Sequence, residues 1–346
     1  MEILFLALGA NRLNLFRDGT RKDQIPCMSN HPVFGAQPLG IGLEGFAYPY
    51  PVHMFVIPEG GERLNMAYMD VAPEGDSNGR TALLLHGRNF PSSYWQTTIK
   101  ALTADGCRVV VPDQIGFGKS SKPLSDLHFD ALARNTAALL DSLHIDTVDV
   151  VAHSMGGMLT TRFARSYPTR VERMVLAAPI GLEDYRLYVP PVTSEKLIEQ
   201  EAKVTPDSYR RWLMTAYELT LPPEALDPYV EARTRIRGSA EFPRWLVAYV
   251  NSYQMIWREP VAAEIPLLTQ PVLFLMGEND HVAPGRDMAP EALRGKMGHN
   301  VELARELAAK MPKANVEMFE GAGHLIHLEA PQRFNESVVS FLNMGR

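Results

Sequence analysis

The sequence predicts an α/β protein with a mostly parallel central sheet, flanked by helices and interrupted by a helical cap. From Thr81 onward, short runs of Val and Leu alternate with stretches of helical periodicity. Such alternation is typical of a parallel sheet whose two faces are both covered by helices. Between about residues 183 and 263 the alternation stops, and the chain becomes helical in character and rich in Trp and Tyr. We expect this stretch to be an insertion between two strands.

The predicted strands are short apolar runs bounded by turn residues. They comprise 53–58, 64–71, Thr81–Leu85, Cys107–Val111, Thr147–Ala152, Val171–Ala177, Val272–Met276 and a short strand around Val316 and Met318. Helices are expected at Tyr94–Asp105, after an N-cap at Ser125, at Met155–Tyr167, around Leu303–Met311 and around Phe334–Leu342. The order predicts one sheet built mainly from βα units.

The chain divides into an arm, a split core and a cap. Residues 1–45 are rich in Gly, Pro and Asn without a clear period, which predicts a loosely structured N-terminal arm. The core is expected at 46–182 and 264–346, with the helical cap, or lid, at 183–263. Most of the aromatic residues in the cap are expected to form its own core, and a few to face a cleft.

Composition excludes several classes of protein. The formal net charge is −6 and there is no long run of Lys or Arg, so nucleic acid is not an expected partner. Cys27 and Cys107 stand far apart in the sequence, which argues against a disulfide scaffold or a cysteine zinc site.

No apolar run has the length of an integral membrane segment. The first ten residues are apolar but lack the basic start of a secretion signal, so we expect a cytoplasmic protein, with a secreted or periplasmic one as the alternative. Nothing specifies an oligomeric state.

The strongest local signal surrounds Ser154, where a predicted strand meets a predicted helix. The segment Val150–Gly157 reads V-V-A-H-S-M-G-G, with small residues at Ala152 and Gly156. A serine in such a tight turn stands above the carboxyl edge of the sheet, beside the free N–H groups of a helix N-terminus. Taken alone, the segment also fits a serine that only caps a helix.

This segment resembles the nucleophile elbow G-x-S-x-G of the α/β-hydrolase family, with Ala152 where glycine is usual. Further segments match that family in the same order: His86-Gly87-Arg88, Gly277–Val282 and Gly321-Ala322-Gly323-His324. The segment Asp113–Ser120 resembles the family's D-x-x-G-x-G-x-S loop, which we interpret as architecture. The resemblance covers about residues 50–345 and implies the α/β-hydrolase fold.

The resemblance implies a catalytic triad of Ser154, Asp280 and His324, in the chain order expected for this fold. Competing candidates for the acid are Asp287, Glu183 and Asp184. His327 lacks the preceding Gly-x-Gly turn and is the weaker histidine, and His86 is expected to be structural. A metal pair of His324 and His327 has no third ligand at suitable spacing, so we expect no metal.

The same resemblance places an oxyanion hole at the backbone N–H groups of Arg88 and Met155. Candidate substrate contacts are Asn89, Phe90, His153 and Trp257. Serine hydrolysis of this kind requires no cofactor.

The predicted function is hydrolysis, through an acyl-enzyme, of a small or medium carboxylic ester. We expect the ester to have an apolar or aromatic part, because the cap is rich in Trp and Tyr. Arg88 is a candidate for attracting a substrate carboxylate, as in a half-ester. Ser at the elbow excludes relatives that use Asp there, the dehalogenases and epoxide hydrolases. One alternative is carbon–carbon bond hydrolysis of ring-cleavage products, whose enzymes often carry S-M-G-G as at 154–157. Amide hydrolysis, acyl transfer and a non-catalytic small-molecule receptor or scaffold are the others.

Overall fold

The computed structural model describes residues 37–59 and 62–344. Cys27, the apolar first ten residues and most of the predicted arm lie outside this part of the chain. Of the arm, residues 37–45 are described and contain no helix or strand. Leu39, Ile41 and Leu43 are buried against Ala232 and Ile236, so this short piece packs on the helical insertion.

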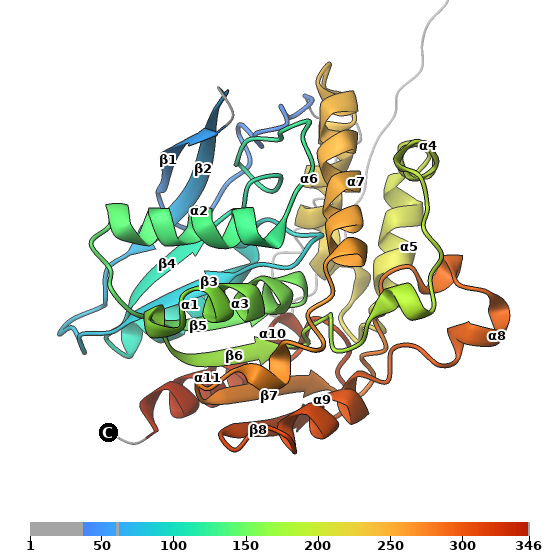
Figure 1. Ribbon diagram of the computed structural model, residues 1–346. Helices are drawn as coiled ribbons and strands as arrows, with labels where there is room; N and C mark the ends of the chain where they lie inside the picture. Colours follow the sequence, from blue (N-terminus) through green and yellow to red (C-terminus); the bar gives the residue numbers. More distant parts are fainter. Residues whose placement is uncertain (1–36, 60–61, 345–346) are drawn as a thin grey trace, which may run out of the picture. The chain divides into compact units, whose positions relative to one another are not determined.

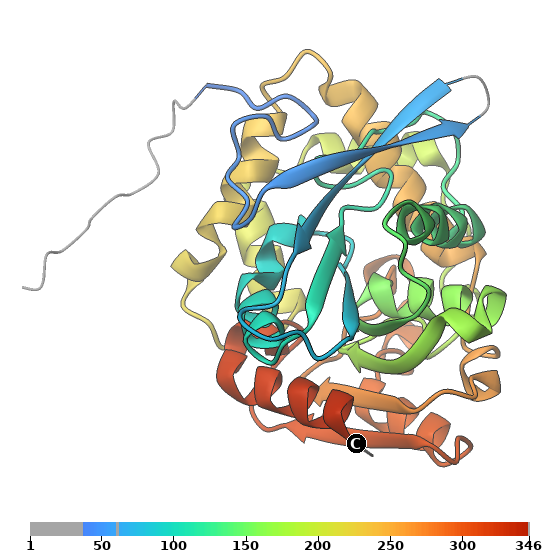
Figure 2. The same ribbon diagram turned by 90° about the vertical axis from the view of Figure 1, so that its left-hand side faces the viewer.

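One mixed sheet organises the described residues, and the predicted α/β class is confirmed (Figure 1). Its strands are β1 Val52–Glu59, β2 Glu62–Val71, β3 Thr81–Leu85, β4 Arg108–Pro112, β5 Val148–His153, β6 Val171–Ala177, β7 Val272–Gly277 and β8 Ala314–Phe319. They lie in the order β1-β2-β4-β3-β5-β6-β7-β8. The β1–β2 and β2–β4 pairs are antiparallel and the remaining pairs are parallel. Figure 2 shows the long β1–β2 hairpin at the edge of the sheet.

Alternation along the strands separates two hydrophobic cores. In β3, Leu83 and Leu85 belong to one core while Ala82 and Leu84 belong to the other. The first core is covered by α2 Phe129–Ser142, α3 Met155–Ser166 and α9 Asn300–Ala308, the second by α1 Gln96–Ala104 and α11 Pro331–Asn343. Successive strand residues face opposite sides, so a strand buried on both faces must be apolar throughout. This is why the strands could be recognised as continuous Val/Leu runs.

Four helices stand between β6 and β7. They are α4 Ser194–Ala202, α5 Pro206–Ala216, α6 Asp227–Ile236 and α7 Phe242–Arg258. We call α4–α7 and their connections the helical insertion. In Figure 1 it stands beside the carboxyl ends of the strands rather than over a face of the sheet. The short helices α8 Glu291–Arg294 and α10 Ile326–Glu329 lie in loops after β7 and β8.

The start of one helix differs from expectation. Ser125 does not cap α2, which begins at Phe129. The Phe129 N–H donates instead to Glu259 Oε2 at 2.8 Å, and His128 Nδ1 lies 2.5 Å from Glu259 Oε1. A carboxylate at a helix N-terminus satisfies its free N–H groups and complements the helix dipole. The capping group comes from 130 residues away, which a local pattern does not reveal.

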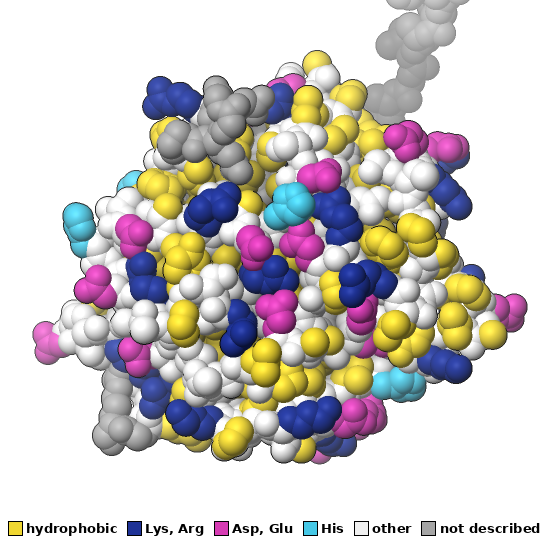
Figure 3. All heavy atoms as spheres, in the orientation of Figure 1, with side chains coloured by type: hydrophobic (Ala, Val, Ile, Leu, Met, Phe, Trp, Pro, Cys, Tyr) yellow, Lys and Arg dark blue, Asp and Glu magenta, His cyan; other side chains and the backbone are white. Residues whose placement is uncertain are grey.

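Both signs of charge are interspersed on the face drawn in Figure 3. No helix within the described ranges has the length and apolar character needed to cross a membrane.

Candidate active site

Ser154 occupies a strained turn between β5 and α3. Its φ of 56° and ψ of −120° place it in a region that non-glycine residues rarely adopt. A Cβ on Gly156 would lie 2.5 Å from the backbone oxygen of Leu85, so the turn requires glycine where α3 approaches β3. Ala152 is fully buried in the core, where its methyl group is accommodated. The turn leaves the Ser154 side chain at the carboxyl edge of the sheet.

Three side chains from distant loops form one hydrogen-bonded chain. His324 Nε2 lies 2.9 Å from Ser154 Oγ, and His324 Nδ1 lies 3.0 Å from Asp280 Oδ2. An ionised Asp280 only accepts, so His324 carries its proton on Nδ1 and leaves Nε2 free to accept from the serine hydroxyl. The His324 and Asp280 side chains are fully buried. The three predicted triad residues are thus brought together in the order that proton transfer requires.

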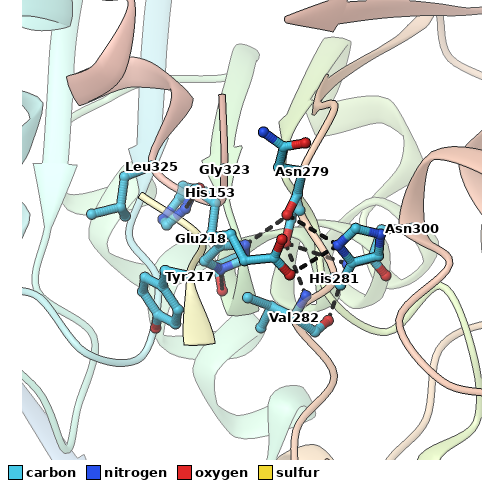
Figure 4. A network of polar contacts seen from close by, with 12 residues as sticks. His153, Tyr217, Glu218, Asn279, His281, Val282, Asn300, Gly323 and Leu325 are labelled. Carbon is cyan, nitrogen blue, oxygen red and sulfur yellow. Dashed lines mark hydrogen bonds and ion pairs between the residues drawn. The ribbon is translucent and has the colours of Figure 1, made fainter. Parts of the chain in front are cut away.

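Besides its contact with His324, Asp280 accepts hydrogen bonds from two other groups. Its Oδ1 accepts from the Val282 N–H at 3.0 Å and from Asn300 Nδ2 at 3.4 Å. Figure 4 shows Val282 and Asn300 beside His281, whose Nδ1 lies 2.9 Å from Glu218 Oε1. Both carboxylate oxygens of Asp280 therefore have partners.

The competing acids make other contacts. Glu183 accepts from the Gly298 N–H at 2.9 Å, and burial raises the pKa of its carboxyl group. Asp184 pairs with Arg186, while Asp287 lines the cavity described below. His327 is fully buried, and neither of its ring nitrogens finds a hydrogen-bond partner among the described residues.

The predicted oxyanion donors lie on two sides of Ser154. Met155 is the first residue of α3, so its N–H has no acceptor within the helix. Arg88 follows Gly87, and a Cβ on Gly87 would lie only 3.0 Å from Ser154 Cβ. Both backbone groups are therefore next to the nucleophile candidate.

A second hydrogen-bonded chain lies beneath these groups. The Gly87 N–H donates to the Tyr94 hydroxyl at 2.8 Å, Tyr94 Oη lies 3.1 Å from His153 Nδ1, and His153 Nε2 lies 2.9 Å from the His324 carbonyl oxygen. The Tyr94 proton is therefore directed at Nδ1, and His153 donates from Nε2 to His324. Burial, with the charges of His327 and His324 added, lowers the pKa of His153 well below its usual value. A neutral His153 connects the loop of Arg88 to the backbone of His324.

Ser154 opens into a cavity of about 750 Å³ between the strand ends and the helical insertion. Its size is typical of sites for small molecules. Tyr209, Tyr217, Arg233 and Tyr249 of the insertion contribute to its wall. A smaller cavity of about 460 Å³ shares Gln200, Asp287 and Met288 with it.

The predicted substrate contacts are distributed unevenly. Asn89 lines the cavity, while Phe90, His153 and Trp257 are not among its lining residues, and all four remain predictions. Phe90 is buried in a cluster of rings with Tyr94 and Tyr229. His153 is used by the second hydrogen-bonded chain, and Trp257 Nε1 donates to the Val189 carbonyl oxygen at 2.9 Å.

Sequence reasoning missed Tyr217. Its carbonyl oxygen accepts from the His324 N–H at 2.9 Å, and the centre of its ring lies 4.5 Å from that of His324. Figure 4 shows its side chain near His153 and Gly323. The abundance of Tyr in 183–263 was visible in the sequence, but nothing local distinguished Tyr217 from its neighbours. No group of three or more His, Cys, Asp or Glu side chains suited to a metal ion occurs in the ranges that the structure describes.

Comparisons with known proteins show to which family and fold the chain is similar. The chain is 39% identical to a probable hydrolytic enzyme from Pseudomonas aeruginosa PAO1, whose crystal structure matches with a TM-score of 0.86 over 89% of this chain and 99% of that one. A thermophilic esterase from Thermogutta terrifontis is 21% identical, with a TM-score of 0.64 over 84% of this chain and 98% of the other, and so shares the fold.

Among curated proteins, a 2-hydroxy-6-oxononadienedioate/2-hydroxy-6-oxononatrienedioate hydrolase from Paraburkholderia xenovorans is 28% identical over 83% of this chain and 93% of its own length. The family model described as the alpha/beta hydrolase family matches residues 82–337. On this match and on its sheet, the chain belongs to the alpha/beta hydrolase family.

Proposed function

We propose that this protein is a serine hydrolase that cleaves a small or medium carboxylic ester through an acyl-enzyme on Ser154. One observation carries the proposal: Ser154 Oγ, His324 and Asp280 form a continuous hydrogen-bonded chain at the wall of a cavity. A serine hydroxyl is a weak nucleophile until a neighbouring base accepts its proton, and His324 is in position to do so.

In the first step, Ser154 Oγ attacks the ester carbonyl carbon while His324 Nε2 takes the hydroxyl proton. The carbonyl oxygen becomes an oxyanion and accepts from the N–H groups of Arg88 and Met155. Asp280 keeps the Nδ1 proton of His324 in place and stabilises the charged imidazole. When the tetrahedral intermediate collapses, the C–O bond breaks and His324 gives its proton to the departing alcohol.

In the second step, water attacks the acyl carbon of the ester formed on Ser154. His324 takes a proton from that water and returns it to Ser154 Oγ as the acid product leaves. Ester and water are thereby converted into acid and alcohol, and the enzyme regains its starting protonation. The helical insertion serves as the cap in this proposal, because its tyrosines form the part of the cavity that an apolar or aromatic substrate would contact.

The test is the release of 4-nitrophenol from a 4-nitrophenyl ester under single-turnover and multiple-turnover conditions. We expect a burst of about one equivalent per protein, and a fall in rate of about 10⁶-fold for Ser154→Ala. Equal, slow release by both proteins would contradict the proposal and favour a binding protein.

Carbon–carbon bond hydrolysis is the second candidate, favoured by the name of the Paraburkholderia xenovorans relative. Assaying a ring-cleavage diketone beside the ester separates the two reactions. Faster Ser154-dependent turnover of the diketone would replace the ester proposal with this one.

A further inference from the structure

Arg88 places a positive charge in the cavity wall without a carboxylate partner. Its guanidinium donates from Nε to Ser252 Oγ at 2.8 Å, from Nη1 to Tyr249 Oη at 3.1 Å and from Nη2 to the Tyr249 carbonyl oxygen at 3.1 Å. Among the Asp and Glu side chains that the structure describes, none forms an ion pair with it. A guanidinium has five N–H donors, so two remain for a ligand.

By contrast, the positive charge of Arg233, the other arginine that bonds to Tyr249, is balanced by a carboxylate. It forms an ion pair with Glu201 and donates to Tyr249 Oη at 2.9 Å. Tyr249 Oη in turn donates to Asn89 Oδ1 at 2.6 Å. Burial opposes ionisation of Tyr249, but the charges of Arg233 and Arg88 outweigh it and lower the pKa of the phenol. Around Tyr249, the positive charge of Arg88 is therefore the one left without a carboxylate partner among the described side chains, while Glu218 and Asp287 line other parts of the cavity.

The charge also lies in the same cavity as the candidate nucleophile. Arg88 directly follows Gly87, where a Cβ would lie 3.0 Å from Ser154 Cβ, and Arg88 and Ser154 line the same cavity. Its guanidinium carbon lies 3.9 Å from the centre of the Tyr249 ring, so the aromatic surface fixes its position. A partly buried charge without a counter-ion is costly, and an anionic ligand would remove that cost.

We propose that Arg88 binds a carboxylate at the far end of the acyl chain, so that the preferred substrates are half-esters of short dicarboxylic acids. This inference rests on the ester hydrolysis proposed above. Charge-assisted hydrogen bonds from the two remaining donors would hold the carboxylate while Ser154 attacks the ester end. The guanidinium thereby selects the substrate, whereas the backbone N–H of the same residue stabilises the oxyanion.

The test compares monoethyl glutarate with ethyl hexanoate by acid release in a pH-stat. We expect the wild-type kcat/KM to favour the half-ester by about 10- to 100-fold, the factor that hydrogen bonds to a charged group usually give. Arg88→Gln should lose most of that preference and Arg88→Lys should retain part of it. Arg286→Gln is the matched control, since it removes another cation of the cavity wall and should keep the preference.

Three results would overturn the inference: no wild-type preference, an equal loss on both esters in Arg88→Gln, or loss of the preference in Arg286→Gln instead. The second would mean that Arg88 only attaches its loop to α7. Binding of monoethyl glutarate to Ser154→Ala, with and without Arg88→Gln, is measured by calorimetry. Arg88-dependent binding without any turnover by the wild type would contradict the ester-hydrolase proposal and support the carboxylate site.

Discussion

The two walls of the cavity differ in the kind of side-chain interactions that form them. On the strand-end wall, Ser154 lines the cavity and bonds to the fully buried His324, which bonds in turn to the fully buried Asp280; the three come from loops of one sheet. On the insertion wall, Arg233 and Tyr249 combine charge with aromatic surface, and Arg88 reaches across from the strand-end side to join them. In the function proposed above, the strand ends carry out bond cleavage and the insertion selects the substrate. Changes on the first wall should lower kcat on every substrate, and changes on the second should alter the ratio between substrates.

Asp280→Asn tests the strand-end wall with the largest expected effect after loss of the serine. An amide donates where the carboxylate accepts, so His324 would be held in the wrong tautomer. We expect kcat to fall by about 10⁴-fold with KM nearly unchanged, as in other Ser-His-Asp enzymes. Steady-state kinetics on a 4-nitrophenyl ester measures both constants.

Asp287→Asn is the control for Asp280, because Asp287 lines the same cavity without contacting His324. Its kinetics should stay close to wild type. If Asp280→Asn retained activity while Glu183→Gln lost it, the acid would be Glu183 and the assignment of Asp280 would be wrong.

Tyr94→Phe tests whether the chain beneath the site positions the strand-end wall. Removing the hydroxyl leaves the Gly87 N–H without its acceptor and His153 Nδ1 without its donor. Loss of one oxyanion donor typically costs about 10²- to 10³-fold, and a displaced donor should cost less, about 10- to 100-fold in kcat. The preference for half-esters over neutral esters should not change.

Tyr229→Phe is the matched control for Tyr94, since Tyr229 packs on the same Phe90 ring and, within the described residues, its hydroxyl is not among the hydrogen-bond partners of the catalytic groups. Its kcat should be unchanged. Thermal unfolding of both variants separates loss of fold from loss of positioning, and an unchanged kcat in Tyr94→Phe would refute a positioning role.

The sequence was most informative about the strand-end wall, for a physical reason. Strands buried on both faces must be apolar, and the residues that follow them must meet at the carboxyl edge of a parallel sheet. Ser154, Asp280 and His324 could therefore be proposed from their places after β5, β7 and β8. The hydrogen bond between Tyr94 and His153 joins side chains that are 59 residues apart in the sequence. Neither residue belongs to a local sequence pattern that predicts this contact.

The insertion wall was less accessible to sequence reasoning. Its helices were expected from composition, but which tyrosines face the cavity depends on how they dock against the strand ends. Trp257 was expected to contact substrate, yet its indole N–H bonds to a backbone oxygen of the chain. Tyr217 and Tyr249 line the cavity, and they bond to His324 and Asn89 through a carbonyl oxygen and a hydroxyl that no residue spacing encodes.

His327→Phe tests whether this buried histidine, which lies behind the strand-end wall, makes the folded protein less stable at acidic pH. Its expected effect is the smallest of those predicted here. Burial, with the charge of His324 added, lowers the pKa of His327 to about 3. Between the ordinary pKa of about 6.5 and that value, the unfolded chain binds a proton that the folded protein does not, so stability falls as the pH falls. His327 is therefore expected to lower the free energy of unfolding by about 1.4 kcal/mol per pH unit, or about 2 kcal/mol at pH 5.

The measurement is urea unfolding at pH 7 and pH 5. Between these two pH values, His327→Phe should lose less of its free energy of unfolding than the wild type does. Exposed His53→Phe should reproduce the wild-type loss. Part of the slope should remain in His327→Phe, because burial also lowers the pKa of His86 and His153. If His327→Phe and the wild type lost equal stability between the two pH values, His327 would not contribute to the loss of stability at low pH.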